Sequence, residues 1–140
     1  MPASALLLSD GQIDFNGVLC SSLSAAASAA RGIPRSANLM RASMVSAVCI
    51  GTNFTRANLE GVDLRDADLS YACLRNARLT EADLEGAKLE FAILSGANLE
   101  YCDLVGADFS NADLKRAKLR GCLYDHTTRW PVGFRPPRSG

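Results

Sequence analysis

The chain repeats a five-residue pattern of apolar and polar positions. In ADLEGAKLEFAILSGANLEYCDL, residues 82–104, a leucine occupies every fifth position and a small residue lies two places before each leucine. The same spacing runs from Leu39 to Leu119, with Met, Cys or Phe replacing Leu in a few repeats, so the chain contains seventeen consecutive repeats. The residue two places before the central one is alanine, except at Thr52, Val62 and Cys102.

This period fits neither a helix nor one continuous strand. Five residues advance an α-helix by about 500°, so successive leucines would wind around all of its faces. Along a strand, side chains alternate between faces, so residues five apart point to opposite sides. Within one repeat, however, the alanine and the central residue are two apart and share a face. The pattern therefore predicts short extended segments joined by one bend per repeat, which is an all-β solenoid with Leu and Ala inside.

The most regular repeats follow the motif A-(N/D)-L-x-x. They include Ala57-Asn58-Leu59, Ala67-Asp68-Leu69, Ala82-Asp83-Leu84, Ala97-Asn98-Leu99 and Ala112-Asp113-Leu114. This motif resembles that of the pentapeptide-repeat family, and the resemblance covers residues 37 to about 124. It implies a right-handed, quadrilateral parallel β-helix with about 20 residues in each coil. The repeats then give about four coils, stacked about 4.8 Å apart.

An offset of 20 residues places the central side chains in four columns. The columns are Leu39, Leu59, Leu79, Leu99, Leu119; Met44, Leu64, Leu84, Leu104; Cys49, Leu69, Leu89, Phe109; and Phe54, Leu74, Leu94, Leu114. Each column forms an apolar ladder, and burying one leucine contributes about 1.5–3 kcal/mol before chain entropy is counted. Asn and Asp beside the central residue are expected to accept hydrogen bonds from backbone amides at the bends. Glycines two places after the centre, such as Gly86, suit bends with positive φ.

The repeat fades at both ends of the chain, and a solenoid needs caps there, because its end coils expose core and unpaired strand edges. We therefore expect residues 1–36 to be an N-terminal cap, residues 37–124 the β-helix and residues 125–140 a capping tail. Residues 21–34 are rich in Ala and Ser and suit a short helix. IDFNGVL, residues 13–19, suits a strand or an irregular first coil.

Apolar residues at both ends indicate what the caps should cover. Val45, Val48 and Ile50 occupy outward positions in the first coil, where we expect the N-terminal cap to cover them. The tail resembles those of cyanobacterial members of the family, whose T-x-W-P-x-G-F motif is here Thr128, Trp130, Pro131, Gly133 and Phe134. Trp130 and Phe134 are expected to lie across the last coil. The tail is short and proline-rich, so we do not expect it to form another coil.

Charge and composition limit the kinds of partner and the cellular compartment that we expect for this protein. Lys plus Arg and Asp plus Glu each number 15, so the net charge is zero, which disfavours nucleic acid. No run of 18 apolar residues predicts a membrane span. The start of the chain lacks a basic segment before Leu6–Leu8, so it is a poor secretory signal. Five cysteines without a C-x-x-C pair fit a reducing compartment. We expect a cytoplasmic bacterial protein, cyanobacterial by the resemblance of its tail.

No catalytic residue, cofactor site, metal site or small-molecule substrate is predicted, because the motifs that carry such chemistry do not occur and the rod is filled. His126, the only histidine, lies in the polar tail and is interpreted as a surface residue. Cys102 and Cys122 share an inward column within possible reach of a disulfide. Buried thiols are the favoured interpretation, because this position takes small side chains that point in parallel.

A column of acidic residues has two interpretations. Asp63, Asp83 and Asp103 lie one place before the central residue in successive coils. They either collect a cation or accept hydrogen bonds at the bends and from water. The second interpretation is favoured, because oxygen ligands of a cation normally converge from several directions.

One outward patch departs from the polar pattern. Tyr71 and Cys73 precede Phe91 and Ile93 by 20 residues, so all four should lie together on neighbouring coils. Such residues, where the repeat calls for Asn, Asp or Gly, suggest a contact surface. A ladder that only stabilises the coils is an equally weighted alternative.

The sequence favours a non-enzymatic solenoid that binds a protein partner or a second copy of itself. The family includes acidic dimers that mimic DNA and bind DNA gyrase, which makes an inhibitor of that kind the second hypothesis. Residues 37–121 contain 12 acids and 10 bases, and this near balance disfavours a DNA mimic. An enzyme is the third and least supported class. Pathway and partner identity are not encoded in any motif of the chain.

Overall fold

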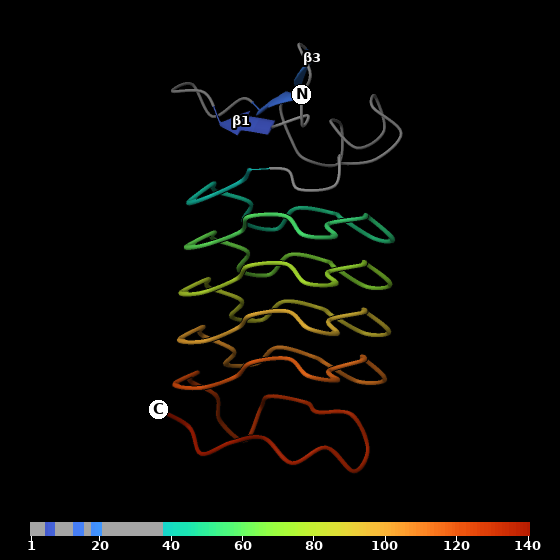
Figure 1. Cartoon of the computed structure of the whole chain (residues 1–140), viewed down its shortest axis with the longest axis vertical. Coiled ribbons are helices and arrows are strands. Elements are labelled where there is room, and N and C mark those ends of the chain that lie inside the picture. The colour runs from blue at the N-terminus through green and yellow to red at the C-terminus, as the bar shows by residue number, and fades with distance from the viewer. Residues whose placement is uncertain (1–4, 8–12, 16–17, 21–37) are drawn as a thin grey trace.

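The computed structural model describes residues 5–7, 13–15, 18–20 and 38–140. The first three segments are the strands β1 (Ala5–Leu7), β2 (Ile13–Phe15) and β3 (Val18–Cys20). They form an antiparallel sheet in the order β1-β2-β3 (Figure 1). Residues within the IDFNGVL segment are thus strands, and they do not belong to an irregular coil, because the coils pair in parallel. The helix expected at residues 21–34 lies outside the described residues.

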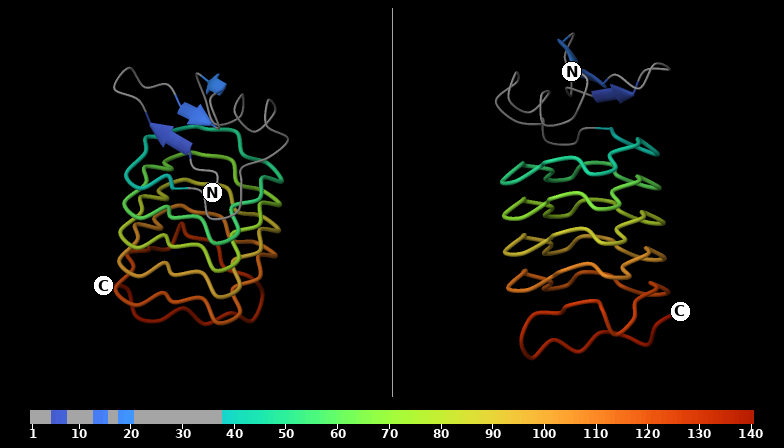
Figure 2. Two further views of the ribbon diagram at one scale, coloured as in Figure 1. Left: turned by 45° about the horizontal axis from the view of Figure 1, so that its top comes forward. Right: turned by 180° about the vertical axis from the view of Figure 1, so that it is seen from behind.

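From Asn38 onward the chain winds into a stack of coils (Figures 1 and 2). Neighbouring coils are joined by parallel bridges, one per repeat, and fourteen of the fifteen bridges join residues 20 apart. One coil therefore takes 20 residues, and the four repeats within it form its four faces. The number of full coils and the capping of the ends stay predictions.

The backbone hydrogen bonds explain why each extended segment is so short. In the repeat centred on Leu84, the N–H groups of Asp83, Leu84 and Gly86 donate to carbonyl oxygens of neighbouring coils at 2.8–2.9 Å. The N–H of Ala87 donates to the Leu84 carbonyl at 3.0 Å, which closes the bend. The remaining N–H, of Glu85, donates to Oδ1 of Asp83 at 3.1 Å. All five amides of the repeat are satisfied, four by the backbone and one by a side chain.

The Asn or Asp beside the central residue provides this last hydrogen bond throughout the stack. In ten repeats its Oδ1 accepts from the N–H two residues later, at 2.9–3.3 Å. The ten acceptors are Asn38, Asn53, Asn58, Asp63, Asp68, Asp83, Asn98, Asp103, Asp108 and Asp113. In these ten repeats the polar residue of the motif therefore stabilises the bend, while the other seven repeats bend in the same way without this hydrogen bond.

Every repeat bends through a residue with positive φ, two places after its centre. The seventeen φ values lie between 56° and 71°. The sequence analysis singled out the glycines at this position, but eleven of the seventeen are other residues. These eleven are Arg41, Ser46, Arg56, Asp66, Tyr71, Asn76, Glu81, Phe91, Tyr101, Asn111 and Arg116. Non-glycine residues adopt this conformation at a cost, and the hydrogen bonds on either side of the bend hold them there.

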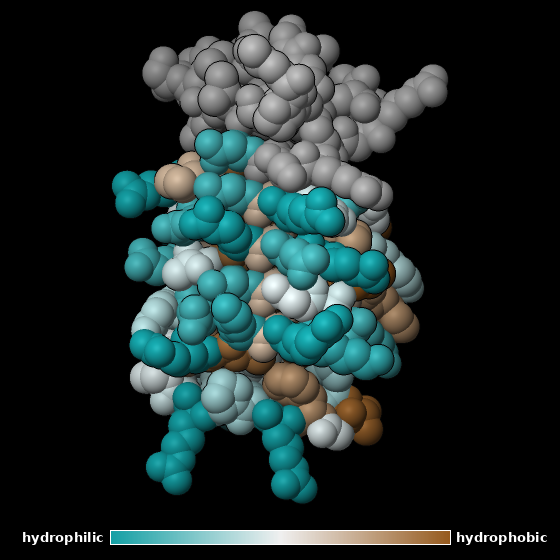
Figure 3. Space-filling model, viewed as in Figure 1, coloured by the Kyte–Doolittle hydropathy of each residue, from teal (hydrophilic) through white to brown (hydrophobic). Residues whose placement is uncertain are grey.

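The core is the column of space inside the coils. We number its faces by their central residues: face 1 (Leu39, Leu59, Leu79, Leu99, Leu119), face 2 (Met44, Leu64, Leu84, Leu104), face 3 (Cys49, Leu69, Leu89, Phe109) and face 4 (Phe54, Leu74, Leu94, Leu114). All of these side chains are at most 7% exposed, and the small residues two places before them are largely buried as well. The predicted inward register is confirmed. Figure 3 shows the consequence outside, where hydrophilic side chains dominate the viewed face.

Three apolar side chains of the first coil point outward, as predicted. Val45, Val48 and Ile50 are 44%, 54% and 56% exposed. Most of residues 1–36, which we expect to cover them, lie outside the described residues, so this cover stays a prediction. Successive side chains of an extended segment point alternately inward and outward, so the segments that bury Met44 and Cys49 turn Val45, Val48 and Ile50 outward.

The register predicts opposite outcomes for two neighbouring residues. Leu84 is fully buried in face 2, so Leu84→Ala should lower the free energy of unfolding by about 2–5 kcal/mol. Leu84→Asp should prevent stable folding, because an unpaired charge would lie in a dry column. Glu85 is exposed, and Glu85→Ala should change stability by about 0.5 kcal/mol or less. Equal losses for the two alanine variants in urea denaturation would contradict this register.

Candidate functional site

The predicted patch contains two exposed aromatic rings stacked on one another. Tyr71 and Phe91 lie on the corner between faces 3 and 4, with ring centroids 5.0 Å apart and an interplanar angle of 4°. Tyr71 is 61% exposed and Phe91 46% exposed. Both have φ of 60°, in the left-handed region. The pair therefore places a large apolar surface in solvent on backbone positions that do not favour bulky residues.

Cys73 and Ile93 continue this surface onto face 4. They are paired by a parallel bridge, and both side chains are half-buried. Bridges also link Cys73 to Asn53 and Ile93 to Asp113, the polar neighbours along the column. All four residues of the patch, Tyr71, Cys73, Phe91 and Ile93, thus lie on adjacent rows of the stack.

A third exposed aromatic residue was missed by the sequence analysis. Tyr101 is 48% exposed and lies on the corner between faces 1 and 2. Arg120 covers its ring, with Cζ 5.7 Å from the centroid, and donates to its hydroxyl at 2.7 Å. The ring also lies over Gly121, where an added Cβ would come within 2.5 Å of it. The feature of the sequence that could have indicated this packing is Gly121, 20 residues after Tyr101. The ring of Tyr101 is covered by residues of its own chain.

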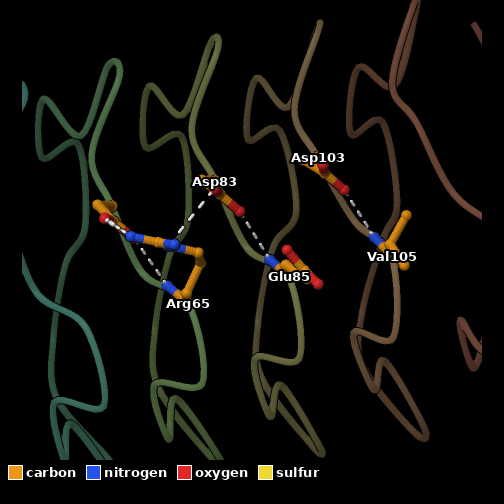
Figure 4. A network of polar contacts seen from close by, with 6 residues as sticks. Arg65, Asp83, Glu85, Asp103 and Val105 are labelled. Atoms are coloured by element: carbon orange, nitrogen blue, oxygen red, sulfur yellow. Dashed lines mark hydrogen bonds and ion pairs between the residues drawn. The ribbon is translucent and has the colours of Figure 1, made fainter.

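The aspartates of the acidic column accept hydrogen bonds at the bends, as the favoured interpretation predicted (Figure 4). Oδ1 of Asp63, Asp83 and Asp103 accepts from the backbone N–H of the residue two places later. Arg65 forms a bidentate ion pair with Asp63, at 2.7 and 2.9 Å, and its Nε lies 3.7 Å from Asp83. The hydrogen bond from Arg65 lowers the pKa of Asp63. Within the described residues, no group of three or more His, Cys, Asp or Glu side chains is placed to hold a metal ion.

The inward cysteines are buried free thiols. Cys102 and Cys122 are fully buried, and Sγ of Cys102 donates to the Leu79 carbonyl at 2.8 Å. Burial raises the pKa of Cys102 to about 12 and also raises that of Cys122. Cys49 is buried in face 3, and burial raises its pKa to about 12. Such thiols are poor nucleophiles, because the reactive thiolate is disfavoured.

The aromatic residues of the tail form a cluster beneath the last repeats. Trp130 stacks on Phe109, with centroids 5.2 Å apart and an interplanar angle of 5°. Phe134 stacks on the other side of the indole at 5.3 Å, and Tyr124 meets it edge-on at 5.3 Å. Trp130 and Phe134 are half-buried and pack against the core. His126 is exposed.

The tail continues the coil further than the sequence analysis expected. Arg129 forms a parallel bridge with Asp108, 21 residues earlier, so one extra residue enters the register here. Thr128 replaces the usual inward alanine, and its buried hydroxyl donates to the Leu104 carbonyl at 2.9 Å. The chain then returns to the previous coil, where the N–H of Gly140 donates to the Cys122 carbonyl at 2.9 Å. The tail thus adds coil pairing beyond Tyr124 that the sequence analysis did not predict.

Comparison with known families agrees with this geometry. A family model described as pentapeptide repeats matches residues 35–61, 42–81 and 82–121, in eight copies. The chain belongs to the pentapeptide-repeat family. Proteins of this family form right-handed β-helices, which is the solenoid expected from the motif. A search of curated proteins finds no match.

Solved pentapeptide-repeat proteins have the same fold. Rfr23 from the cyanobacterium Cyanothece 51142 is 36% identical, with a TM-score of 0.57 over 69% of this chain and 62% of that one. A protein from the Arabidopsis thaliana thylakoid lumen is 26% identical, with a TM-score of 0.60 over 63% of each chain. The present chain spans less than two thirds of either relative. QnrB1, a plasmid-mediated fluoroquinolone resistance protein, is 18% identical with a TM-score of 0.40 over 65% of this chain and 60% of its own, a likeness too small to indicate function.

No helix within the described residues of this pentapeptide-repeat protein is long and apolar enough to cross a membrane.

The acid response of the fold should depend on Asp108. Burial raises its pKa, but hydrogen bonds from Ser110 and the charge of Arg129 outweigh this, so the pKa is lowered overall. A lowered folded-state pKa stabilises the fold above the unfolded pKa, about 4, and this contribution is lost as the pH falls through the folded pKa. Asp108→Asn keeps an Oδ1 acceptor for Ser110 without the charge. Its free energy of unfolding should therefore change less between about pH 4 and pH 2 than that of the wild type.

Glu85→Gln is the matched control for this titration, because Glu85 is exposed and its carboxylate accepts no hydrogen bond within residues 38–140. Denaturant titrations across the acid range measure all three proteins. If Asp108→Asn and the wild type lose stability in parallel, Asp108 does not contribute to the acid response.

The aromatic cluster predicts that the tail caps the last coil. Deleting residues 126–140 removes Trp130 and Phe134, so the truncated protein should melt at a lower temperature and associate or aggregate through its uncovered end. In the full chain, emission of Trp130, the only tryptophan, should be blue-shifted from that of free tryptophan and move red on unfolding. A truncated protein that stays monomeric and equally stable, with native emission like that of free tryptophan, would show a loose extension.

Proposed function

We propose that the protein is a non-enzymatic interaction module that binds a protein partner, or a second copy of itself, through the patch of Tyr71, Cys73, Phe91 and Ile93. The stacked and exposed Tyr71–Phe91 pair carries this proposal. The interior of the rod is filled by the four ladders, so its outer surface is where it meets other molecules. Related pentapeptide-repeat proteins supply the fold but no partner.

The backbone argues that the two aromatic residues are not there for the fold alone. Asn or Gly would occupy a positive-φ position with less strain, and Asn111 holds the same column one coil below Phe91. Nine other non-glycine residues of the rod share this conformation, so what distinguishes Tyr71 and Phe91 is that two large rings are exposed there. Exposed aromatic residues next to apolar ones are also typical of protein contacts.

The alternative, a stabilising ladder, makes a different energetic claim. A stacked aromatic pair contributes about 0.5–1.5 kcal/mol beyond its area burial. Tyr101 shows how an exposed aromatic residue of this rod is covered by its own chain, through Arg120. The Tyr71–Phe91 rings contact one another but keep about half or more of their surface in solvent. This remaining area is available to a partner.

Charge gives the gyrase hypothesis no support. A DNA mimic needs a strongly acidic surface, whereas residues 37–121 carry 12 acids against 10 bases. We therefore keep a protein contact as the proposed function. A reducing bacterial cytoplasm fits the buried free thiols of Cys102 and Cys122.

The test separates association from stability. The double variant Tyr71→Ser/Phe91→Ser should lose self-association in sedimentation velocity, or lose the partner captured from the native cell extract. Its free energy of unfolding should fall by no more than about 1.5 kcal/mol. Tyr101→Ser is the control, because it removes an exposed aromatic residue from another corner. Unchanged association together with a sharp fall in melting temperature would identify the pair as a stabilising ladder.

A further inference from the structure

The charges of the rod are unevenly distributed around its axis. We define the face 4 surface as the four outward columns that begin at Gly51, Asn53, Thr55 and Arg56 and repeat every 20 residues. The acids of residues 38–121 are Glu60, Asp63, Asp66, Asp68, Glu81, Asp83, Glu85, Glu90, Glu100, Asp103, Asp108 and Asp113. Of these twelve, only Asp113 belongs to the face 4 surface. The same surface carries four bases: Arg56, Arg75, Lys115 and Arg116. A nearly neutral rod therefore has one locally basic side.

These bases lie beside the aromatic patch. Along one coil the outward residues run Tyr71, Cys73 and Arg75, and one coil below they run Phe91, Ile93 and Ser95. The apolar patch thus occupies one corner and the middle of face 4, and the bases occupy its other corner. A chain lying across face 4 would meet both.

The basic corner contains a notch that is polar and open. Its volume is about 320 Å³, and it is lined by Arg75, Asn76, Ser95, Asp113, Lys115 and Arg116. Next to the notch, the side chain of Asn76 lies over Gly96, where an added Cβ would collide with its Oδ1. The cationic groups of Arg75, Lys115 and Arg116 and the hydrogen-bond donors beside them suit a carboxylate.

The cations around this notch are not used by the fold. Arg65, Arg78 and Arg129 form ion pairs with carboxylates of their own chain. None of the ion pairs within residues 38–140 includes Arg75 or Arg116, and both side chains are exposed. They retain their charge for an external anion.

The aromatic corner has an open position directly above its ladder. Gly51 precedes Tyr71 by 20 residues in the same column, and a Cβ added there would meet nothing within 4 Å. Tyr71 stacks on Phe91, in the next coil, with one face of its ring, and Gly51 lies in the preceding coil of the same column. A flat group from another molecule, placed beside Gly51 and against the ring of Tyr71, would add one more ring to the Tyr71–Phe91 stack.

We infer that the face 4 surface binds an acidic polypeptide segment with an aromatic anchor. The aromatic anchor stacks on the ring of Tyr71, in the open position beside Gly51. The carboxylates next to the anchor pair with Arg56, Arg75, Lys115 and Arg116. This inference rests on the proposed function and names the chemistry of the partner. Apolar contact supplies binding free energy, and the cations select acidic sequences.

The surroundings of the surface favour a polypeptide over a nucleic acid. Strong single-strand binding needs a positive groove that follows many phosphates. Here the bases occupy one corner, and the other columns carry eleven acids. A long polyanion would run past the basic corner and meet Glu60 or Glu90, whereas a short acidic segment would end within it.

The test uses fluorescein-labelled peptides and fluorescence anisotropy. The probe is the pentapeptide Glu-Glu-Trp-Glu-Glu, compared with Lys-Lys-Trp-Lys-Lys and Glu-Glu-Ser-Glu-Glu. We expect saturable binding of the first peptide alone at low salt, and weaker binding at about 0.5 M salt because the charges are screened. Arg75→Glu/Arg116→Glu should weaken this binding by at least about tenfold.

Two variants sharpen the readout. Arg41→Glu/Lys88→Glu changes the net charge equally but on other sides of the rod, and should change the affinity by less than about twofold. Gly51→Phe fills the open position with a residue type that the column already tolerates at Tyr71 and Phe91, and should remove the advantage of Trp over Ser in the probe. Circular dichroism spectra identical to the wild type confirm that each variant folds.

Three results would overturn the inference: equal loss in both charge variants, equal binding of the lysine peptide, or tighter binding of an oligothymidylate of about ten nucleotides. The double variant Tyr71→Ser/Phe91→Ser distinguishes failure of this inference from failure of the proposed function. If that variant loses its native association but the wild type binds no acidic peptide, the patch is a contact surface for another class of partner. If the peptide binds through the arginines and ignores the aromatic pair, the proposed contact surface is wrong as well.

Discussion

The structure depends on the hydrogen bonds between the coils. Each repeat donates to and accepts from its neighbours along the axis, so every coil must return to the same position after 20 residues. A five-residue repeat meets this condition with four bends, and each bend requires positive φ. The side-chain pattern follows from this backbone, because the two residues that face inward must fit a narrow column. Leucine fills the column and alanine leaves room for it.

The same constraint separates structural from free positions. In the repeat of Leu84, packing and the bend fix the inward residues and Asp83, whereas the side chain of Glu85 is exposed and not fixed. Among the repeats of this chain, the residue at the outer corner differs widely in type while the coil stays the same. The aromatic corner at Tyr71 and the basic corner at Arg75 are two such positions on one face. Within the aromatic corner, Tyr71 and Phe91 are adjacent only because the coil brings residues 20 apart into contact.

The repeat made the core predictable from the sequence, because periodicity alone decides which residues face inward. The Tyr71–Phe91 contact followed from the same arithmetic. The orientation of long side chains did not: Arg120 lies over Tyr101, and Arg65 pairs with Asp63, through rotamers that no period specifies. The tail was predicted least well, because beyond Tyr124 its pairing depends on one extra residue and on individual contacts such as Thr128 with Leu104. The N-terminal segment shows the same limit, since a non-repeating segment has no period from which its contacts with Val45, Val48 and Ile50 could be predicted.

The extra residue between Asp108 and Arg129 has a consequence for the length of the rod. A strictly periodic chain has no internal reason to stop, because each coil offers the next one an identical template. One inserted residue shifts the register of the repeat. Past it, residues that would have pointed outward point inward, and the large ring of Trp130 takes the inward position next to Phe109. We expect this shift to hinder the addition of a further coil, because the segment beyond Arg129 no longer offers the pattern that each coil offers the next.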